Sequence, residues 1–288
     1  MSTIEKDEVT GRDTTGHEWD GIKELNTPLP KWWLYVFIAC IVWAFGYWVL
    51  YPAWPTLHGY TRGLLGYSSR AQLADQMRSF ADSQRVWTDR IAKASLAAIA
   101  ADPELLRYAI GGGRSIFAAN CSQCHGAGGQ GVQGFPILAD DNWMWGGTAD
   151  QIAQTIRYGV NNGDDRARQS QMPNFGGDKL LEPAQIDDVA EYVLSLTKRA
   201  DDPAAAARGK EVFAQQCAAC HGDQGEGKTD VGAPRLNGQI WLWGGTKAAI
   251  VAQVTHPRQG VMPVWEGRLN DVAIKMVATY VHSLGGGQ

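Results

Sequence analysis

The pentapeptide C-x-x-C-H occurs twice in this chain, as CSQCH at 121–125 and as CAACH at 217–221. Two thiols at this spacing can form thioethers with the vinyl groups of one haem, and the histidine that follows can reach the iron. Because each copy is followed by a similar downstream sequence, we expect two covalently bound haem c groups. The predicted attachment residues are Cys121, Cys124, Cys217 and Cys220, and the predicted proximal ligands are His125 and His221.

Two other uses of these cysteines compete with haem attachment. Each C-x-x-C pair can form a disulfide, or it can contribute to a zinc site. A structural zinc ion usually takes four ligands from one compact cluster, and the histidine directly after the second cysteine favours haem in both copies. The fifth cysteine, Cys40, lies in an apolar run. With a net charge of −4 and no basic block, the sequence indicates no nucleic-acid partner.

The two motifs belong to an internal repeat, in which residues 113–198 and 209–284 align as one module used twice. GRSIFAANCSQCHGAGGQG matches GKEVFAQQCAACHGDQGEG, and FPILADDNWMWGGT matches APRLNGQIWLWGGT. Each module then has a Met-Pro pair and a last amphipathic helix. We expect residues 200–208, with Pro203 as a breaker, to be the linker. The insert NNGDDRARQS at 161–170 has no counterpart in the second module and is expected to be a solvated loop.

The Met-Pro pairs supply the predicted sixth ligands. Met172 in SQMPNF and Met262 in GVMPVW occur in equivalent loops, so we expect the pairs His125/Met172 and His221/Met262. Met144 is the main competitor at the first haem, but the second module has Leu242 at that position. Histidine and methionine together fill both axial positions and raise the reduction potential. This predicts electron transfer rather than oxygen binding.

An apolar run of twenty residues, WWLYVFIACIVWAFGYWVLY at 32–51, contains no charge and has aromatic residues at both ends. This length spans about 30 Å as a helix, which is the thickness of a bilayer core. We therefore predict a transmembrane helix at 32–52. The polar residues before it are expected to form a mostly disordered tail. Residues 69–100 have a heptad-like apolar stripe, interrupted at Gln84, and are expected to form one long helix.

The tandem modules resemble the class I cytochrome c fold over nearly all of residues 113–284. The resemblance implies an all-α fold around each haem, with the first helix of a module packed on its last. Gly113 and Phe117 would then meet Tyr192, and Gly209 and Phe213 would meet Tyr280. It also implies that a proline carbonyl accepts a hydrogen bond from each haem histidine, and the repeated WGG segment offers a tryptophan that could line the haem edge and bind a propionate. The candidates are Pro136 and Pro234 for the first role, and Trp145 and Trp243 for the second.

The stretch HEWDGIKELNTPLPKWW at 17–33 resembles the corresponding segment of the di-haem subunit III of cbb3-type cytochrome c oxidases, the CcoP/FixP family. The resemblance spans almost the whole chain. It implies electron transfer towards the oxidase catalytic subunit from a soluble or membrane-bound cytochrome c donor, or from the mono-haem cytochrome subunit. Oxygen is reduced in another subunit, so whether this chain counts as an enzyme stays open.

The combined expectation is a bacterial inner-membrane protein with two tandem class I cytochrome c domains outside the membrane. Haem attachment takes place on the periplasmic side, so the haem domains should be periplasmic and the N-terminus cytoplasmic. The expected parts are a tail at 1–31, a transmembrane helix at 32–52, a helical connector at 53–108, and domains at 109–199 and 205–288. An independent membrane-anchored di-haem carrier or gas sensor, and a di-haem peroxidase with one open iron, are the alternatives.

Overall fold

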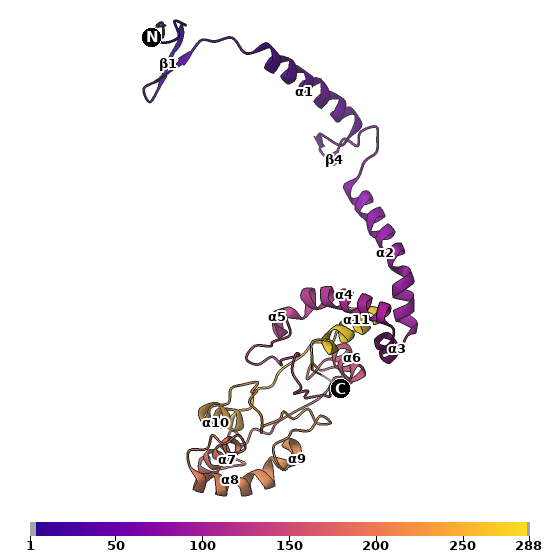
Figure 1. Cartoon of the computed structure of the whole chain (residues 1–288), viewed down its shortest axis with the longest axis vertical. Helices are drawn as coiled ribbons and strands as arrows, with labels where there is room; N and C mark the ends of the chain where they lie inside the picture. Colours follow the sequence, from indigo (N-terminus) through magenta and orange to yellow (C-terminus); the bar gives the residue numbers. More distant parts are fainter. Residues whose placement is uncertain (1–3, 287–288) are drawn as a thin grey trace. The chain divides into compact units, whose positions relative to one another are not determined.

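The computed structural model describes residues 4–286 and is mostly helical (Figure 1). The first three residues of the predicted tail and the last two of the predicted second domain lie outside the described part. The chain forms two compact units, which divide between Ser83 and Gln84.

The first unit contains the predicted apolar helix, α1 (Lys31–Leu50). Pro30 precedes it, and none of its residues is buried within the chain. A helix of this length that is apolar on every face is typical of a membrane span rather than of a soluble core. The prediction of one N-terminal apolar helix is confirmed, with the last helical residue at Leu50 rather than at residue 52.

The segment before α1 is ordered, so the expectation of a mostly disordered tail was wrong. Strands β1 (Thr14–Trp19) and β2 (Ile22–Leu25) form an antiparallel hairpin. Asp20 and Gly21 connect them with φ of 51° and 85°. Both values are positive, as in the two-residue turns that favour Asp-Gly. This dipeptide is a sequence signal for a hairpin that the sequence analysis missed.

A second small hairpin follows α1, so the connector is not helical throughout. It consists of β3 (Pro55–Thr56) and β4 (Gly59–Tyr60). The chain after it turns back to the helix end, where the Leu64 and Leu65 N–H groups donate to the carbonyls of Val49 and Leu50 at 2.9 and 3.1 Å. These bonds satisfy two carbonyls that have no partner within the helix.

The predicted long helix at 69–100 is two helices, α2 (Ser69–Lys93) and α3 (Leu96–Ala101). Ser95 separates them because its hydroxyl accepts from the Ala98 N–H and caps α3. The polar interruption at Gln84 also has a partner, since the Tyr108 hydroxyl donates to Gln84 Oε1 at 2.8 Å.

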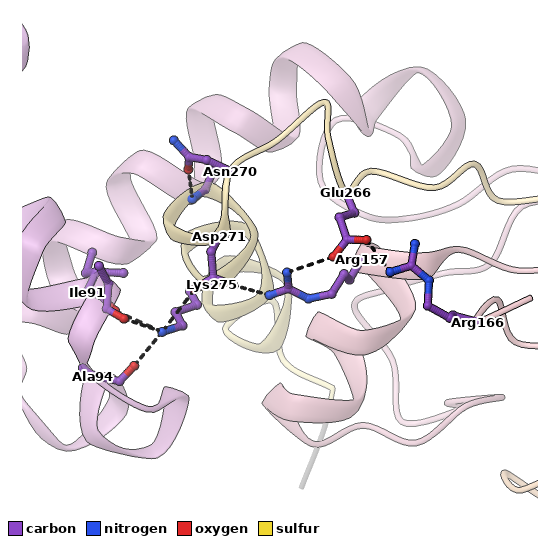
Figure 2. Close-up of polar contacts among 10 residues, drawn as sticks. Ile91, Ala94, Arg157, Arg166, Glu266, Asn270, Asp271 and Lys275 are labelled. Carbon is purple, nitrogen blue, oxygen red and sulfur yellow. Dashed lines mark hydrogen bonds and ion pairs between the residues drawn. The ribbon is translucent and has the colours of Figure 1, made fainter. Parts of the chain in front are cut away.

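Lys275 closes the end of α2 (Figure 2). Its ammonium group donates to the carbonyls of Ile91, Ala92 and Ala94 at 3.3, 2.9 and 2.9 Å. A cation at a helix C-terminus also interacts favourably with the helix dipole. The connector is therefore fixed to α11 (Asp271–His282), the last helix of the chain.

The second unit has two lobes, defined here by their helices (Figure 1). The first lobe contains α3, α4 (Pro103–Asn120), α5 (Ser122–His125), α6 (Ala149–Tyr158) and α11. The second lobe contains α7 (Pro183–Ser195), α8 (Pro203–Gln216), α9 (Ala218–His221) and α10 (Lys247–Thr255). In chain order, the second lobe is inserted between α6 and α11.

The expected helix pairing within each module was therefore wrong, because the two modules exchange their last helices. Phe117 on α4 meets Tyr280 on α11, with ring centroids 5.3 Å apart. Phe213 on α8 meets Tyr192 on α7 at 5.0 Å. A Cβ added at Gly113 would collide with α11 at the Met276 carbonyl.

The same close approach occurs in the second lobe, where a Cβ at Gly209 would collide with the backbone of Asp188 on α7. The physical reason for the exchange is the short connection between α7 and α8, which favours antiparallel neighbours. Pro203 does not break the chain there. It occupies the first turn of α8, which Asp202 caps through the Ala204 and Ala205 N–H groups.

Candidate haem sites

Each C-x-x-C-H motif begins where a long helix ends. Cys121 is the C-terminal cap of α4, and the rest of the motif forms the single turn α5. Cys217 and α9 repeat this arrangement after α8. In each copy the glycine that follows, Gly126 or Gly222, has φ of +79° and ends the turn directly after the histidine.

The two histidines have the predicted proline partners. Nδ1 of His125 lies 3.0 Å from the carbonyl oxygen of Pro136, and Nδ1 of His221 lies 2.9 Å from that of Pro234. A carbonyl can only accept, so Nδ1 carries the proton and Nε2 keeps its lone pair for a metal. Burial lowers the pKa of both imidazoles, against a smaller opposite effect of the carbonyl, and this favours the neutral ligating form.

The glycine-rich loops bring these prolines into position. The Gly131 N–H donates to the His125 carbonyl at 2.8 Å, and the Gly227 N–H donates to the His221 carbonyl at 2.7 Å. Both glycines have positive φ, and a Cβ on either would collide with backbone atoms of its own loop. The glycines allow the chain to turn back tightly after each histidine. This explains their spacing, and no phosphate ligand is needed to account for it.

The structure brings the methionines together with the opposite motifs from those expected. Met262 packs on the core of the first lobe together with Cys121, and Met172 packs on the core of the second lobe together with Cys217. The members of the predicted pairs His125/Met172 and His221/Met262 therefore do not lie on the same lobe. This arrangement follows from the insertion of the second lobe, because each methionine lies on the same lobe as the helix that follows it in the chain. Met172 precedes α7 of the second lobe, and Met262 precedes α11 of the first.

Two buried indole nitrogens show whether a haem fits these residues. Trp143 packs on the first core and Trp241 on the second, at equivalent positions of the repeat. Among the described residues, their Nε1 atoms are the buried side-chain nitrogen or oxygen atoms without a hydrogen-bond partner. An unpaired buried donor costs free energy unless a bound group accepts from it. A haem propionate is such an acceptor, so the donor set fits haem in both lobes.

Sequence reasoning had assigned this role to the neighbouring residues Trp145 and Trp243. Those rings lie instead between the lobes. Trp243 lies over Gly134 of the first lobe and Trp145 over Gly232 of the second, where a Cβ on either glycine would meet the ring. All four tryptophans are partly buried, and Trp143 and Trp241 differ from the other two in packing on the cores with a buried, unpaired Nε1.

A second feature missed in the sequence is an arginine four residues before each methionine. Arg168 precedes Met172 and Arg258 precedes Met262, in the shared pattern R-Q-x-x-M-P. The Arg168 guanidinium lies 5.3 Å from the Trp145 ring, and that of Arg258 lies 4.6 Å from the Trp243 ring. These cation–π contacts position both interlobe tryptophans. Aligning the modules from the Met-Pro pairs backwards would have found them.

The competing uses of the cysteines receive no support from the geometry. All five cysteines are unpaired, and no group of three His, Cys, Asp or Glu side chains within residues 4–286 could hold a metal ion. Burial, followed by the neighbouring cysteine, raises the pKa of both Cys121 and Cys217 to about 11. A redox-active C-x-x-C pair instead has a thiol with a lowered pKa.

Comparison with known families covers most of the chain. Residues 11–58 match the N-terminal domain of cytochrome oxidase-cbb3, FixP, and residues 111–197 match cytochrome c. Residues 204–281 match the cbb3-type cytochrome c oxidase subunit III family. Three adjacent parts of one chain thus match the parts of one kind of subunit.

Similar proteins match the chain over nearly its full length. It is 50% identical to the cbb3-type cytochrome c oxidase subunit CcoP of Azospirillum brasilense, with 100% of both chains covered. It is 50% identical to the FixP subunit of Bradyrhizobium diazoefficiens over 99% of this chain and 98% of that one. Identity to CcoP of Cereibacter sphaeroides is 49%, over 96% and 95%. With its two cytochrome c modules and apolar N-terminal helix, the chain belongs to the CcoP/FixP family of cbb3-type cytochrome c oxidase subunits.

Proposed function

We propose that this chain is the membrane-anchored electron-transfer subunit of a cbb3-type oxidase and that it holds two haem c groups. Cys121 and Cys124 would bind the first haem and Cys217 and Cys220 the second. The axial pairs would be His125/Met262 and His221/Met172. The observation that carries this proposal is the presence, in each lobe, of a proline-oriented histidine, a methionine and an unpaired buried indole N–H.

The bound haem supplies a reversible one-electron couple at its iron. The chain contributes a fixed environment for that couple. The Pro136 and Pro234 carbonyls hold each imidazole in one tautomer and orientation. Met262 and Met172 would supply the second ligand in each lobe, and the Trp143 and Trp241 indoles would donate to the propionates. With a histidine and a methionine as ligands, each iron would have no open position for oxygen, which suits electron transfer.

In the membrane, α1 would anchor the chain with the haem domains on the periplasmic side and the hairpin β1–β2 in the cytoplasm. Electrons would come from a periplasmic or membrane-bound cytochrome c, or from a mono-haem subunit, and would leave towards the catalytic subunit. Support for this comes from family membership and from the apolar surface of α1. Trp145 and Trp243 lie at the contact between the lobes, so the two haems would be held in adjacent lobes of one unit.

The test is purification of the full chain in mild detergent from its native membrane. A pyridine haemochrome assay should give two haems per chain, both ferric sites should have spectra of six-coordinate His/Met haem, and a haem–copper catalytic subunit should co-elute. Peroxide turnover at a five-coordinate haem would instead indicate a di-haem peroxidase. Recovery as a stable single polypeptide would indicate an independent carrier.

A further inference from the structure

We propose that the segment between α6 and α7, residues 159–168, is a positioning element for Met262 and that Asn162 is its central side chain. This inference rests on the proposed ligation of the first haem by His125 and Met262. The segment includes most of the insert that is absent from the second module. It occupies the place at which the chain leaves the first lobe.

Both backbone polar groups of Met262 are bound to this segment. The Val160 N–H donates to the Met262 carbonyl at 3.0 Å, and the Met262 N–H donates to the Val160 carbonyl at 2.9 Å. The Asn162 side-chain amide adds a second donor to the Met262 carbonyl at 2.9 Å and also donates to the Tyr158 carbonyl at 2.8 Å. The amide of Asn162 therefore joins the end of α6 to the methionine backbone.

The approach is so close that residue 159 must be glycine. A Cβ at Gly159 would collide with the Met262 and Pro263 carbonyls, and its φ is +74°. The segment itself is braced from the other side. Arg168 N–H donates to the Gly159 carbonyl at 3.1 Å, and Asn161 N–H donates to the Arg168 carbonyl at 2.9 Å. Val160 thus lies between two paired stretches of chain.

Contacts on both sides of Met262 extend this hold. Asn161 donates from its side chain to the Gly260 carbonyl at 3.2 Å, two residues before the methionine. Four residues after it, Glu266 accepts from Arg166 at 2.6 Å and lies 3.6 Å from Arg157 (Figure 2). The Glu266 N–H also donates to the Arg157 carbonyl at 3.1 Å. The loop is therefore fixed before, at and after the proposed ligand.

Met172 has no such hold. Within residues 4–286, no hydrogen bond involves its backbone N–H or carbonyl. Its loop is held further along, where Asn174 Oδ1 lies 3.2 Å from Nδ1 of His256 and the Gly177 N–H donates to the Thr255 carbonyl at 3.1 Å. A ligand held in its binding conformation loses less free energy on binding than a mobile one. Met262 should therefore resist displacement by external ligands better than Met172.

The test uses the full-length holoprotein and titrates both ferric haems with imidazole, which competes with methionine for iron. Binding is followed by loss of the methionine–iron charge-transfer band at the red end of the visible spectrum. In the unmodified chain we expect two phases, with the Met262 haem binding imidazole more weakly. Asn162→Ala should strengthen imidazole binding in that phase about 5- to 10-fold, as expected for one lost hydrogen bond to a constrained loop. The other phase should not change.

Asn174→Ala is the matched control, because it removes an asparagine from the Met172 loop and should leave the Met262 phase unchanged. If Asn162→Ala lowers the haem content, Asn162→Asp replaces it, since it keeps the shape but has no N–H donor. An unchanged Met262 phase in the Asn162 variant, or equal changes in both phases, would overturn the inference. Met262→Ala distinguishes the two levels. Loss of the band from one haem in that variant supports Met262 as an iron ligand, whereas two intact bands would contradict the axial pair His125/Met262 in the proposed function.

Discussion

The two lobes are built from the same repeat but stabilise the exchanged helix, α7 or α11, in different ways. In the second lobe, α7 carries the buried carboxylate of Glu191, which accepts from the Asp201 and Asp202 N–H groups at 3.0 and 3.3 Å and pairs with Lys247 at 2.9 Å. The equivalent position on α11 is Thr279, which bonds only within its helix. There, Lys275 binds α2 instead. The first lobe thus depends on the connector, and the second on an internal ion pair.

A module of the sequence repeat is therefore not the same stretch of chain as a lobe of the structure. The second lobe folds from one continuous stretch of chain, whereas the first needs α11 from the far end. The first lobe also has its own apolar cluster with α2 and α3, built on Ile91, Leu96, Ile99, Leu105 and Ala109. The end of α2 and α3 are therefore packed into the first lobe.

The largest effect should come from breaking the helix pairs themselves. Phe117→Ala and Phe213→Ala each remove a fully buried ring and should lower the free energy of unfolding by about 3–5 kcal/mol. Double-mutant cycles in chemical denaturation then identify the partner. We expect a coupling of about 0.5–1.5 kcal/mol between Phe117 and Tyr280 and none between Phe117 and Tyr192. Coupling of Phe117 to Tyr192 would instead indicate that each module keeps its own last helix.

An intermediate effect should distinguish the buried charge of the second lobe. Glu191→Gln should lower the free energy of unfolding of that lobe by about 2–3 kcal/mol, because Lys247 loses its buried partner. Thr279→Val is the matched change in the first lobe and should cost about 1 kcal/mol or less. The free energy of unfolding of each lobe is measured from the denaturation curve of its haem. Equal losses in the two variants would contradict a special role for the buried charge of Glu191.

The same carboxylate predicts a pH dependence. The hydrogen bond from Lys247, with further help from the Asp202 and Asp201 N–H groups, lowers the pKa of Glu191 below its ordinary value of 4.5. The unfolded chain therefore binds more protons than the folded one, and stability rises with pH in this range. The contribution of Glu191 should be complete above pH 4.5 and should disappear as the pH falls through the lowered pKa. In Glu191→Gln this part of the acid unfolding curve should be absent.

A smaller effect should be confined to the first lobe. Lys275→Met removes the ammonium group that binds three carbonyls at the end of α2 and should cost about 1–2 kcal/mol. Hydrogen exchange should become faster in the last turn of α2 and in α3, with no change in α7 and α8. Faster exchange in α7 and α8 as well would show that the contact of Lys275 with α2 also stabilises the second lobe.

The sequence identified the attachment motifs and the candidate methionines, but not the topology that decides which methionine lies on which lobe. The cysteines and histidines follow from one short motif, and the role of the Pro136 and Pro234 carbonyls was implied by the resemblance to cytochromes c. The exchange of α7 and α11 does not follow, because both copies present the same glycine and aromatic residues to either partner. Only the short connection ahead of Pro203 favours one choice, and it was interpreted as a linker.

The pairing of Met262 with the first lobe is the central point, and single-haem chains test it most directly. Cys121→Ser with Cys124→Ser leaves only the haem on Cys217 and Cys220. In that background, Met172→Ala should abolish the ferric methionine–iron charge-transfer band, and Met262→Ala should leave it in place. Loss of the band in Met262→Ala, with retention in Met172→Ala, would show that each module keeps its own methionine.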